Sequence, residues 1–367
     1  MRLMSTELLK PGIVLGRSIY NERGKALLNE GVTLTDRHII RLKELNIPFV
    51  HIFDPLTSHI KVVETVSAEL RRKAVSSIYS AFRELQEEPQ MSTTVVLEKT
   101  TRHFKGLVSE LVQELHKHQD LVQLLTDVYT YDSYIFTHSL NVTLYTIAVG
   151  IKLKLTRCKL ETLALGALLH DVGKLAVPLD ILLKPGRLTE EEFSEIKNHA
   201  ENGFKMLKDI SSIPIIAAHC AYQHHERLDG SGYPRGLKGE DIHHFGKIIA
   251  VADVFDAVTS NRSYRSAMLP HEGLEILYAG AGTQFDRDIV KAFRKSVAIY
   301  PNSLVVRLND GRKAVVSRQN HDVSDRPVVE IFEEEGKLLE STYEVDLEAQ
   351  LDVIITGCDT GSFVLQA

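Results

Sequence analysis

His170-Asp171-Val172-Gly173-Lys174 (HDVGK, residues 170–174) is the most informative stretch of the chain, because more metal-binding side chains follow it. His199 falls in a predicted helix, His224-His225 open the run HHERLDGSGYPRG, and Asp253 lies in AVADVFDAV. Imidazole nitrogens and carboxylate oxygens suit zinc, manganese and iron. A lone His-Asp pair is more often structural, but this series of His and Asp residues within one helical stretch predicts a dinuclear metal hydrolase.

Length and composition limit the class of protein. A chain of 367 residues is long enough for two or three domains. Its 44% hydrophobic and 25% charged residues are typical of a soluble globular protein. The formal net charge of −6 argues against binding of a nucleic acid polymer, which needs a basic surface. A small phosphate ligand stays compatible with that charge, because a local pocket can be basic in an acidic protein.

Cysteine usage and hydropathy bear on location. The cysteines are scattered and lack a Cys-x-x-Cys spacing, which favours a reducing compartment; they are Cys158, Cys220 and Cys358. The opening MRLMSTELLKPG lacks the apolar centre of a signal peptide. The best apolar run, LYTIAVGIKLKL, is shorter than the roughly 18–20 residues that span a bilayer and contains Lys152 and Lys154. We therefore expect a cytoplasmic protein without a membrane span.

The pattern of hydrophobic residues and turns divides the chain into four segments. We expect a small β-rich N-terminal module at 1–60, a helical connector at 61–117, a helical domain at 118–300 that holds every metal candidate, and a small C-terminal β module at 301–367. The connector has no convergent catalytic residues, so its expected role is to link the modules or to form a homodimer.

Local signals predict where individual elements begin and end. Arg23-Gly24 separates two strand-like runs, and Asp310-Gly311 marks a second hairpin. A helix is expected from Thr35-Asp36. Thr189 and Glu192 predict a capping box at the start of the helix that carries His199, and Asp286 begins the last helix of the helical domain.

These motifs resemble the HD-GYP family of bacterial cyclic di-GMP phosphodiesterases, a branch of the HD hydrolase superfamily. The resemblance covers about residues 120–300 and rests on HDVGK at 170–174, HHERLDGSGYP at 224–234, ADVFDAVTSNRSYR at 252–265 and YTYDSYIFTHSLNV at 129–142. It implies a mainly α protein, with a helical HD-type metal-hydrolase domain between small β-rich N-terminal and C-terminal modules.

The resemblance also implies two sets of metal ligands. The first metal would take His138, His170, Asp171 and Asp253; the second would take Asp171, His199, His224 and His225. We expect two divalent ions per chain, iron or manganese first and zinc as an alternative. A water shared by two such ions loses a proton near neutral pH and attacks phosphorus in line, which makes the bridging Asp171 a catalytic residue.

Four residues are candidates for substrate contacts, each with a structural alternative. Lys174 is expected to contact a phosphate of the substrate and to take part in catalysis. The structural alternative for Lys174 is a surface ion pair. Arg262 and Arg265 would bind phosphates or guanines, or simply offset a helix dipole. Tyr233 would stack on a guanine or only shape its glycine-rich loop.

One position departs from the family pattern. Tyr134 stands where some members have a glutamate that binds a third metal, and Asp132 is displaced on the helix. We therefore expect two metals, with linear pGpG as the main product and GMP formed slowly or not at all. Two alternative functions stay open: a cyclic di-GMP sensor without turnover, and a phosphodiesterase for a related cyclic dinucleotide or for mononucleotides.

Overall fold

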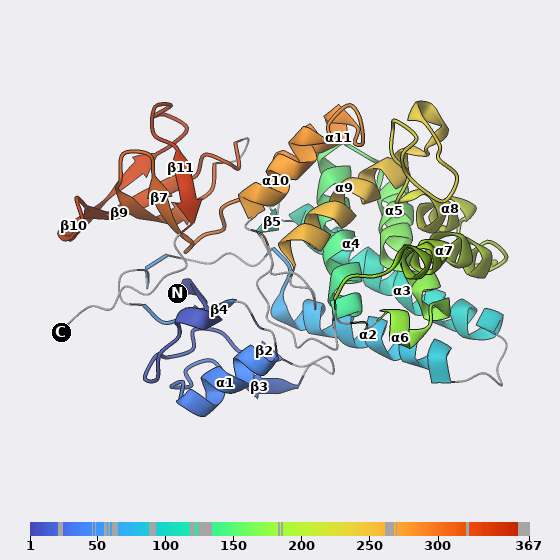
Figure 1. Cartoon of the computed structure of the whole chain (residues 1–367), viewed down its shortest axis with the longest axis horizontal. Coiled ribbons are helices and arrows are strands. Elements are labelled where there is room, and N and C mark those ends of the chain that lie inside the picture. Colours follow the sequence, from blue (N-terminus) through green and yellow to red (C-terminus); the bar gives the residue numbers. More distant parts are fainter. Residues whose placement is uncertain are drawn as a thin grey trace.

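The computed structural model describes residues 1–20, 25–45, 47, 49–54, 57, 59–60, 65–87, 93–117, 122–123, 134–182, 184, 186–260, 268, 270–320 and 323–358. Figure 1 shows a large helical body on one side of the molecule and two smaller, strand-containing modules on the other. The protein is mainly α, which confirms the predicted fold class. Among the described residues, no helix combines the length and apolar character needed to cross a membrane.

The N-terminal module contains two antiparallel strand pairs and one helix. Strand β1 (Arg2–Ser5) pairs with β4 (Phe49–Ile52), and β2 (Ile19–Tyr20) pairs with β3 (Ala26–Leu28). A short 3₁₀ helix, η1 (Thr6–Leu8), follows β1. A capping box at Thr35 starts helix α1 (Asp36–Glu44), as predicted. The module has its own small hydrophobic core, and the predicted turn at Arg23-Gly24 lies outside the described residues.

The helical body is built around two central helices, α4 (Tyr134–Lys152) and α5 (Arg157–Leu169). Helix α4 packs against α5 and α9, and α5 packs against α3 and α8. The other elements of the body are α2 (Ala68–Glu87), α3 (Thr93–Lys117), η4 (Val172–Ala176), α6 (Leu179–Leu182), α7 (Glu190–Leu207), α8 (Ile215–Gln223), η5 (Gly239–Asp241), α9 (His244–Thr259), α10 (Pro270–Ala279) and α11 (Arg287–Arg294). The capping box of Thr189 and Glu192 starts α7, and Asp286 caps α11, so both predicted helix starts are confirmed.

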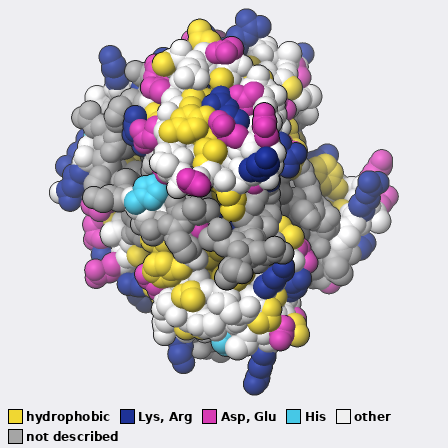
Figure 2. Space-filling model, turned by 90° about the vertical axis from the view of Figure 1, so that its left-hand side faces the viewer, with side chains coloured by type: hydrophobic (Ala, Val, Ile, Leu, Met, Phe, Trp, Pro, Cys, Tyr) yellow, Lys and Arg dark blue, Asp and Glu magenta, His cyan; other side chains and the backbone are white. Residues whose placement is uncertain are grey.

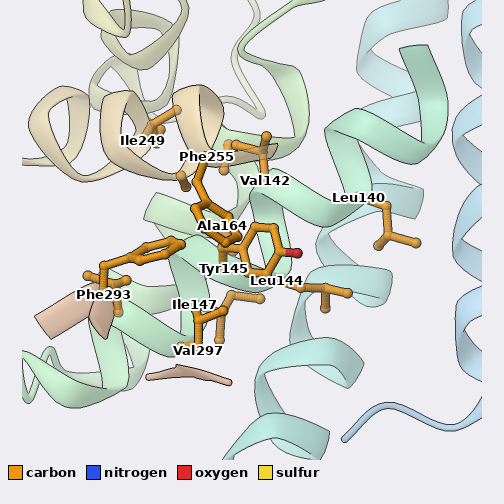
Figure 3. Packing of buried hydrophobic residues seen from close by; sticks show 14 of the residues in the cluster. Leu140, Val142, Leu144, Tyr145, Ile147, Ala164, Ile249, Phe255, Phe293 and Val297 are labelled. Atoms are coloured by element: carbon orange, nitrogen blue, oxygen red, sulfur yellow. The ribbon is translucent and has the colours of Figure 1, made fainter. Parts of the chain in front are cut away.

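Aromatic side chains pack between α4, which carries His138, and α9, which carries Asp253. The Tyr145 ring meets the Phe255 ring edge-on at 5.5 Å, and Phe293 from α11 lies 4.7 Å from Phe255. Figure 3 shows these three rings among the aliphatic residues of the core. Helices that are apolar on all sides are typically buried, and the rigid packing fixes the relative position of the site residues.

The predicted connector helices are part of the same hydrophobic core. Helix α2 packs against α3 and α4, and α3 packs against α5. Apolar side chains of both helices are buried within the chain, including Val75, Ile78, Phe104 and Leu111. These side chains are therefore covered without a second copy, and the predicted homodimer would need another surface.

The C-terminal module is an antiparallel sheet with the strand order β10-β9-β8-β7-β11. Its strands are β7 (Val305–Leu308), β8 (Lys313–Arg318), β9 (Val328–Glu334), β10 (Lys337–Asp346) and β11 (Ile355–Cys358). The β7–β8 hairpin turns at Asp310-Gly311, as predicted. A short parallel pair, β5 (Val122–Gln123) and β6 (Val297–Ala298), contacts α4 and α11 of the helical body. Figure 2 shows the face of the two smaller modules, where hydrophobic side chains are scattered among charged ones.

Candidate metal centre

Five separate parts of the helical body bring the seven predicted ligands together. His138 lies in the first turns of α4, His170 and Asp171 join α5 to η4, and His199 lies on α7. His224 and His225 follow α8, and Asp253 lies on α9. His225 is partly exposed, whereas the other six are buried: His138, His170, Asp171, His199, His224 and Asp253.

Three histidines lie around the carboxylate of Asp171. The Nε2 atoms of His199 and His224 lie 3.4 and 3.8 Å from Asp171 Oδ1. Together with His225, these residues offer ligand atoms that all lie within 4.8 Å of one another. This is the group predicted for the second metal, and its mixture of three imidazoles and a carboxylate suits a divalent transition metal.

The other oxygen of Asp171 faces a second group. Asp171 Oδ2 lies 3.6 Å from His138 Nε2 and 3.4 Å from His170 Nε2, and these three residues form another compact ligand group. Asp253 adjoins this group, with Oδ1 3.2 Å from His138 Nε2, while its Oδ2 lies 3.7 Å from His225 Nδ1. Asp171 is therefore shared by both groups, and Asp253 reaches toward both.

Backbone carbonyls set the orientation of three histidine rings. The Nδ1 atoms of His170, His199 and His224 lie 2.7, 2.6 and 3.0 Å from the carbonyl oxygens of the residues three positions earlier. A carbonyl can only accept, so each Nδ1 carries the proton and donates it. Each Nε2 is then left with a lone pair directed at Asp171, which is the tautomer that binds a metal.

Two buried polar atoms of this cluster lack a hydrogen-bond partner among the described residues. They are His170 Nε2 and Asp171 Oδ1. An unsatisfied buried polar atom costs roughly 1–3 kcal/mol, and such atoms are few in native proteins. A divalent cation held by these lone pairs would remove that cost, so the residues present fit the metal that the motif implies.

The electrostatics keep Asp171, His224 and His225 in their metal-binding forms. Burial alone would raise the pKa of Asp171, but Lys174 and the neighbouring histidines hold it well below its usual range. Burial and the adjacent imidazoles hold the pKa values of His224 and His225 well below 6.5. An ionised carboxylate and neutral imidazoles are the forms that coordinate metals.

Lys174 contacts the shared carboxylate directly. Its Nζ lies 2.5 Å from Asp171 Oδ2, and the side chain is 21% exposed. The ion pair predicted as the structural alternative is therefore present, but it is with a ligand inside the site. A phosphate contact stays a prediction, and the partial exposure leaves the ammonium accessible to one.

The glycine-rich loop packs directly on the ligands. The Tyr233 ring stacks on His225, with centres 4.6 Å apart, and the Tyr233 N–H donates to the His225 carbonyl. A Cβ on Gly232 would lie 2.4 Å from Arg227 N and 2.5 Å from the His225 carbonyl oxygen, so only glycine allows this approach. The loop thus positions His225 as well as bordering the site.

Two buried carboxylates that contact the site residues or the glycine-rich loop were missed by the sequence analysis. Asp256, one turn after Asp253 on α9, lies 2.7 Å from His138 Nδ1. Glu226 is buried beside the His-His pair and accepts hydrogen bonds from the N–H groups of Arg235 and Leu237. Both carboxylates lie within motifs that the sequence analysis quoted. The three-residue spacing of Asp253 and Asp256 could have indicated that both side chains face the same side of a helix.

Several predicted positions cannot be placed. Arg262, Arg265 and Asp132 lie outside the described residues. Helix α9 ends at Thr259, before both arginines. Tyr134 is the first residue of α4, one turn before His138.

Comparisons with known proteins agree with this geometry. Residues 96–289, more than half of the chain, match the family model described as HD domain, and residues 305–364 match a KOW domain associated with HD domain. A cyclic di-GMP phosphodiesterase of Pseudomonas aeruginosa is 35% identical over 266 residues, which cover 72% of this chain and 62% of the relative.

Two further relatives match the helical body over shorter stretches. A cyclic di-GMP phosphodiesterase response regulator of Xanthomonas campestris pv. campestris is 43% identical over 151 residues, covering 41% of this chain and 40% of the relative. The 3'3'-cGAMP-specific phosphodiesterase 3 of Vibrio cholerae is 38% identical over 165 residues, which cover 45% of this chain and 36% of the relative. This chain thus spans less than two thirds of the length of each. The chain belongs to the HD domain family, and its resemblance to the HD-GYP branch is confirmed.

Proposed function

We propose that this protein is a metal-dependent phosphodiesterase that hydrolyses cyclic di-GMP to linear pGpG. The observation that carries the proposal is the division of the ligands into two groups that share Asp171. Two divalent ions held in this way supply a hydroxide near neutral pH and neutralise charge on the phosphoryl oxygens. Relatives named cyclic di-GMP phosphodiesterases support this choice of substrate.

The residues of the chain have distinct proposed roles. Asp171 links the two ligand groups, and Lys174 offers an ammonium beside it for a phosphate oxygen. Tyr233 stacks on His225 and is the proposed aromatic contact for a guanine of the substrate. Arg262 and Arg265 are proposed substrate contacts on the sequence alone. Iron or manganese is the proposed metal, with zinc as the alternative.

Cleavage of a related cyclic dinucleotide is the second candidate, and the relative that is specific for 3'3'-cGAMP favours it. The decisive experiment incubates the purified protein, loaded with Mn²⁺ or Fe²⁺, with cyclic di-GMP, 3'3'-cGAMP and GMP, and separates the products by chromatography. We expect pGpG from cyclic di-GMP at the highest kcat/KM. Higher kcat/KM for 3'3'-cGAMP would select the second candidate, and tight binding without any product would select a sensor.

The number of metals and the product are proposed together. With Tyr134 in place of a glutamate, two metals per chain are expected, and pGpG should accumulate before GMP. Elemental analysis showing three metals per chain, or GMP released without detectable pGpG, would contradict this. Tyr134→Glu is the converse variant, and it should raise metal content above two per chain if the surrounding groups can complete a third site.

A further inference from the structure

Lys197 is a cation at the edge of the metal centre that the proposed mechanism does not use. It lies on α7, two residues before His199. Its Nζ lies 4.6 Å from the centre of the Phe193 ring and 5.8 Å from the centre of the Tyr233 ring. In the described part of the chain, no carboxylate lies within ion-pairing distance of this ammonium.

The neighbouring acids on α7 are engaged elsewhere. Glu201, one turn after Lys197, pairs with Lys205 at 2.7 Å. The carboxylate of Glu195 accepts a hydrogen bond from Asn198 at 3.1 Å. A lysine on a helix surface would ordinarily use such partners. Lys197 instead contacts two aromatic rings, which leaves its ammonium available to a ligand.

The two rings connect Lys197 to the metal ligands. Tyr233 stacks on His225, and its centre lies 6.4 Å from the centre of the His199 ring. Phe193 lies one turn before Lys197, and 45% of its surface is exposed. An ammonium without an ion-pair partner among the described residues and an exposed aromatic ring therefore lie beside Tyr233, which packs on His225 and lies near His199.

We propose that Lys197 binds the phosphodiester of the cyclic dinucleotide that is not being cleaved, while Phe193 offers its face to the adjoining base. This inference rests on the proposed function. A cyclic dinucleotide carries two phosphodiesters, and the metal centre can act on only one of them at a time. The second phosphate needs a cation outside the metal centre, and Lys197 combines a free charge with a location next to Tyr233. Lys197 thereby favours cyclic dinucleotides over substrates with one phosphodiester.

The test compares two substrates. Steady-state kinetics of the Mn²⁺-loaded protein would be measured with cyclic di-GMP and with bis(4-nitrophenyl) phosphate, which has a single phosphodiester. Losing a charge-assisted contact corresponds to roughly a tenfold change or more. We expect Lys197→Gln to lower kcat/KM for cyclic di-GMP by about that factor, chiefly by raising KM. Its kcat/KM for bis(4-nitrophenyl) phosphate should stay at the wild-type value. Lys197→Arg should retain most of the wild-type value.

Lys205→Gln is the matched control, since Lys205 lies on the same helix but pairs with Glu201. This variant should leave kcat/KM unchanged for both substrates. Equal kcat/KM for cyclic di-GMP in wild type and Lys197→Gln would overturn the inference. An equal loss on both substrates would also overturn it, because Lys197 would then act through the metal centre. If the wild type cleaved bis(4-nitrophenyl) phosphate but no cyclic dinucleotide, the proposed function itself would fail and the inference with it.

Discussion

The imidazole of His138 and the carboxylate of Asp256 form a buried pair, with Nδ1 and Oδ2 2.7 Å apart. The other oxygen of Asp256 accepts a hydrogen bond from Asn141 Nδ2 at 2.9 Å. This pair links α4 to α9 and directs His138 Nε2 at Asp171 and Asp253. A carboxylate behind a histidine ligand fixes its ring and raises its basicity, so Asp256 is expected to act on metal binding without touching the metal.

We expect Asp256→Asn to weaken metal binding at the site that includes His138 by roughly 10–100-fold. Asparagine has nearly the same shape, so the helices should stay in place while the negative charge behind His138 is lost. Titration against a competing chelator would measure the affinity. Asp180→Asn, an exposed residue on α6, is the control and should bind metal like the wild type. Unchanged affinity in Asp256→Asn would show that Asp256 is only a packing residue.

The stability of the chelator-treated protein should fall between pH 6.5 and pH 9. Burial opposes a charge on His138, but the carboxylates of Asp253 and Asp256 raise its pKa to about 9. Because the pKa of His138 is higher in the folded protein than the 6.5 of the unfolded chain, its protonation stabilises the fold. This stabilisation is fully present below pH 6.5 and is lost as pH rises through about 9. The loss corresponds to about 3 kcal/mol.

Urea unfolding at several pH values, with excess chelator, would measure this effect. His138→Gln removes the titrating group, so its free energy of unfolding should change less over the same interval. His224 and His225 affect stability in a different pH range, because their lowered pKa values reduce it only as pH falls below 6.5. Parallel curves for wild type and His138→Gln between pH 6.5 and 9 would rule out the proposed protonation.

The sequence predicted those features that depend on short spacings. The capping box of Thr189 and the hairpin at Asp310-Gly311 are local, and the ligand motifs carried enough chemistry to suggest a shared site. Asp256 and Glu226 were missed because their roles need tertiary contacts: Asp256 matters only once α9 lies beside α4, and Glu226 only once the loop folds back over it. The helical character of residues 61–117 was predicted, but periodicity does not say which surface a helix covers.

Asp171→Ala should lower bound metal and abolish phosphodiester hydrolysis while the far-ultraviolet circular dichroism stays near wild type. Asp171 is the one residue common to both ligand groups, so its loss affects both. Elemental analysis after purification and a hydrolysis assay would measure the two effects. Asp180→Ala serves as the control for loss of an exposed carboxylate. A folded Asp171→Ala protein with full turnover would contradict a shared-carboxylate site.

Gly173→Ala should destabilise the protein through backbone contacts alone. A Cβ at Gly173 would lie 2.0 Å from the His199 carbonyl oxygen and 2.4 Å from Gly203 N, so α7 would have to move away from η4. Overpacking of this kind costs roughly 1–3 kcal/mol or more. Gly106→Ala in α3 is the control, because a Cβ there meets nothing within 4 Å. Since alanine has the higher helix propensity, this variant should raise the free energy of unfolding by up to about 1 kcal/mol. Thermal unfolding that ranked the two variants equally would contradict the tight contact.

Glu226→Gln should loosen the glycine-rich loop and, through Tyr233, the orientation of His225. The buried Glu226 carboxylate accepts from two N–H groups, those of Arg235 and Leu237, at 2.9 Å each. Glutamine offers one oxygen and places an N–H₂ group against the second donor, which leaves buried groups unsatisfied at roughly 1–3 kcal/mol. Hydrogen exchange of residues 227–239 should become faster, and metal affinity at the His225 site should fall with it. Glu340→Gln, at an exposed position of β10, is the control and should leave hydrogen exchange and metal affinity unchanged. Slow exchange in Glu226→Gln would mean that the packing of Gly232 and Tyr233 is enough to hold the loop.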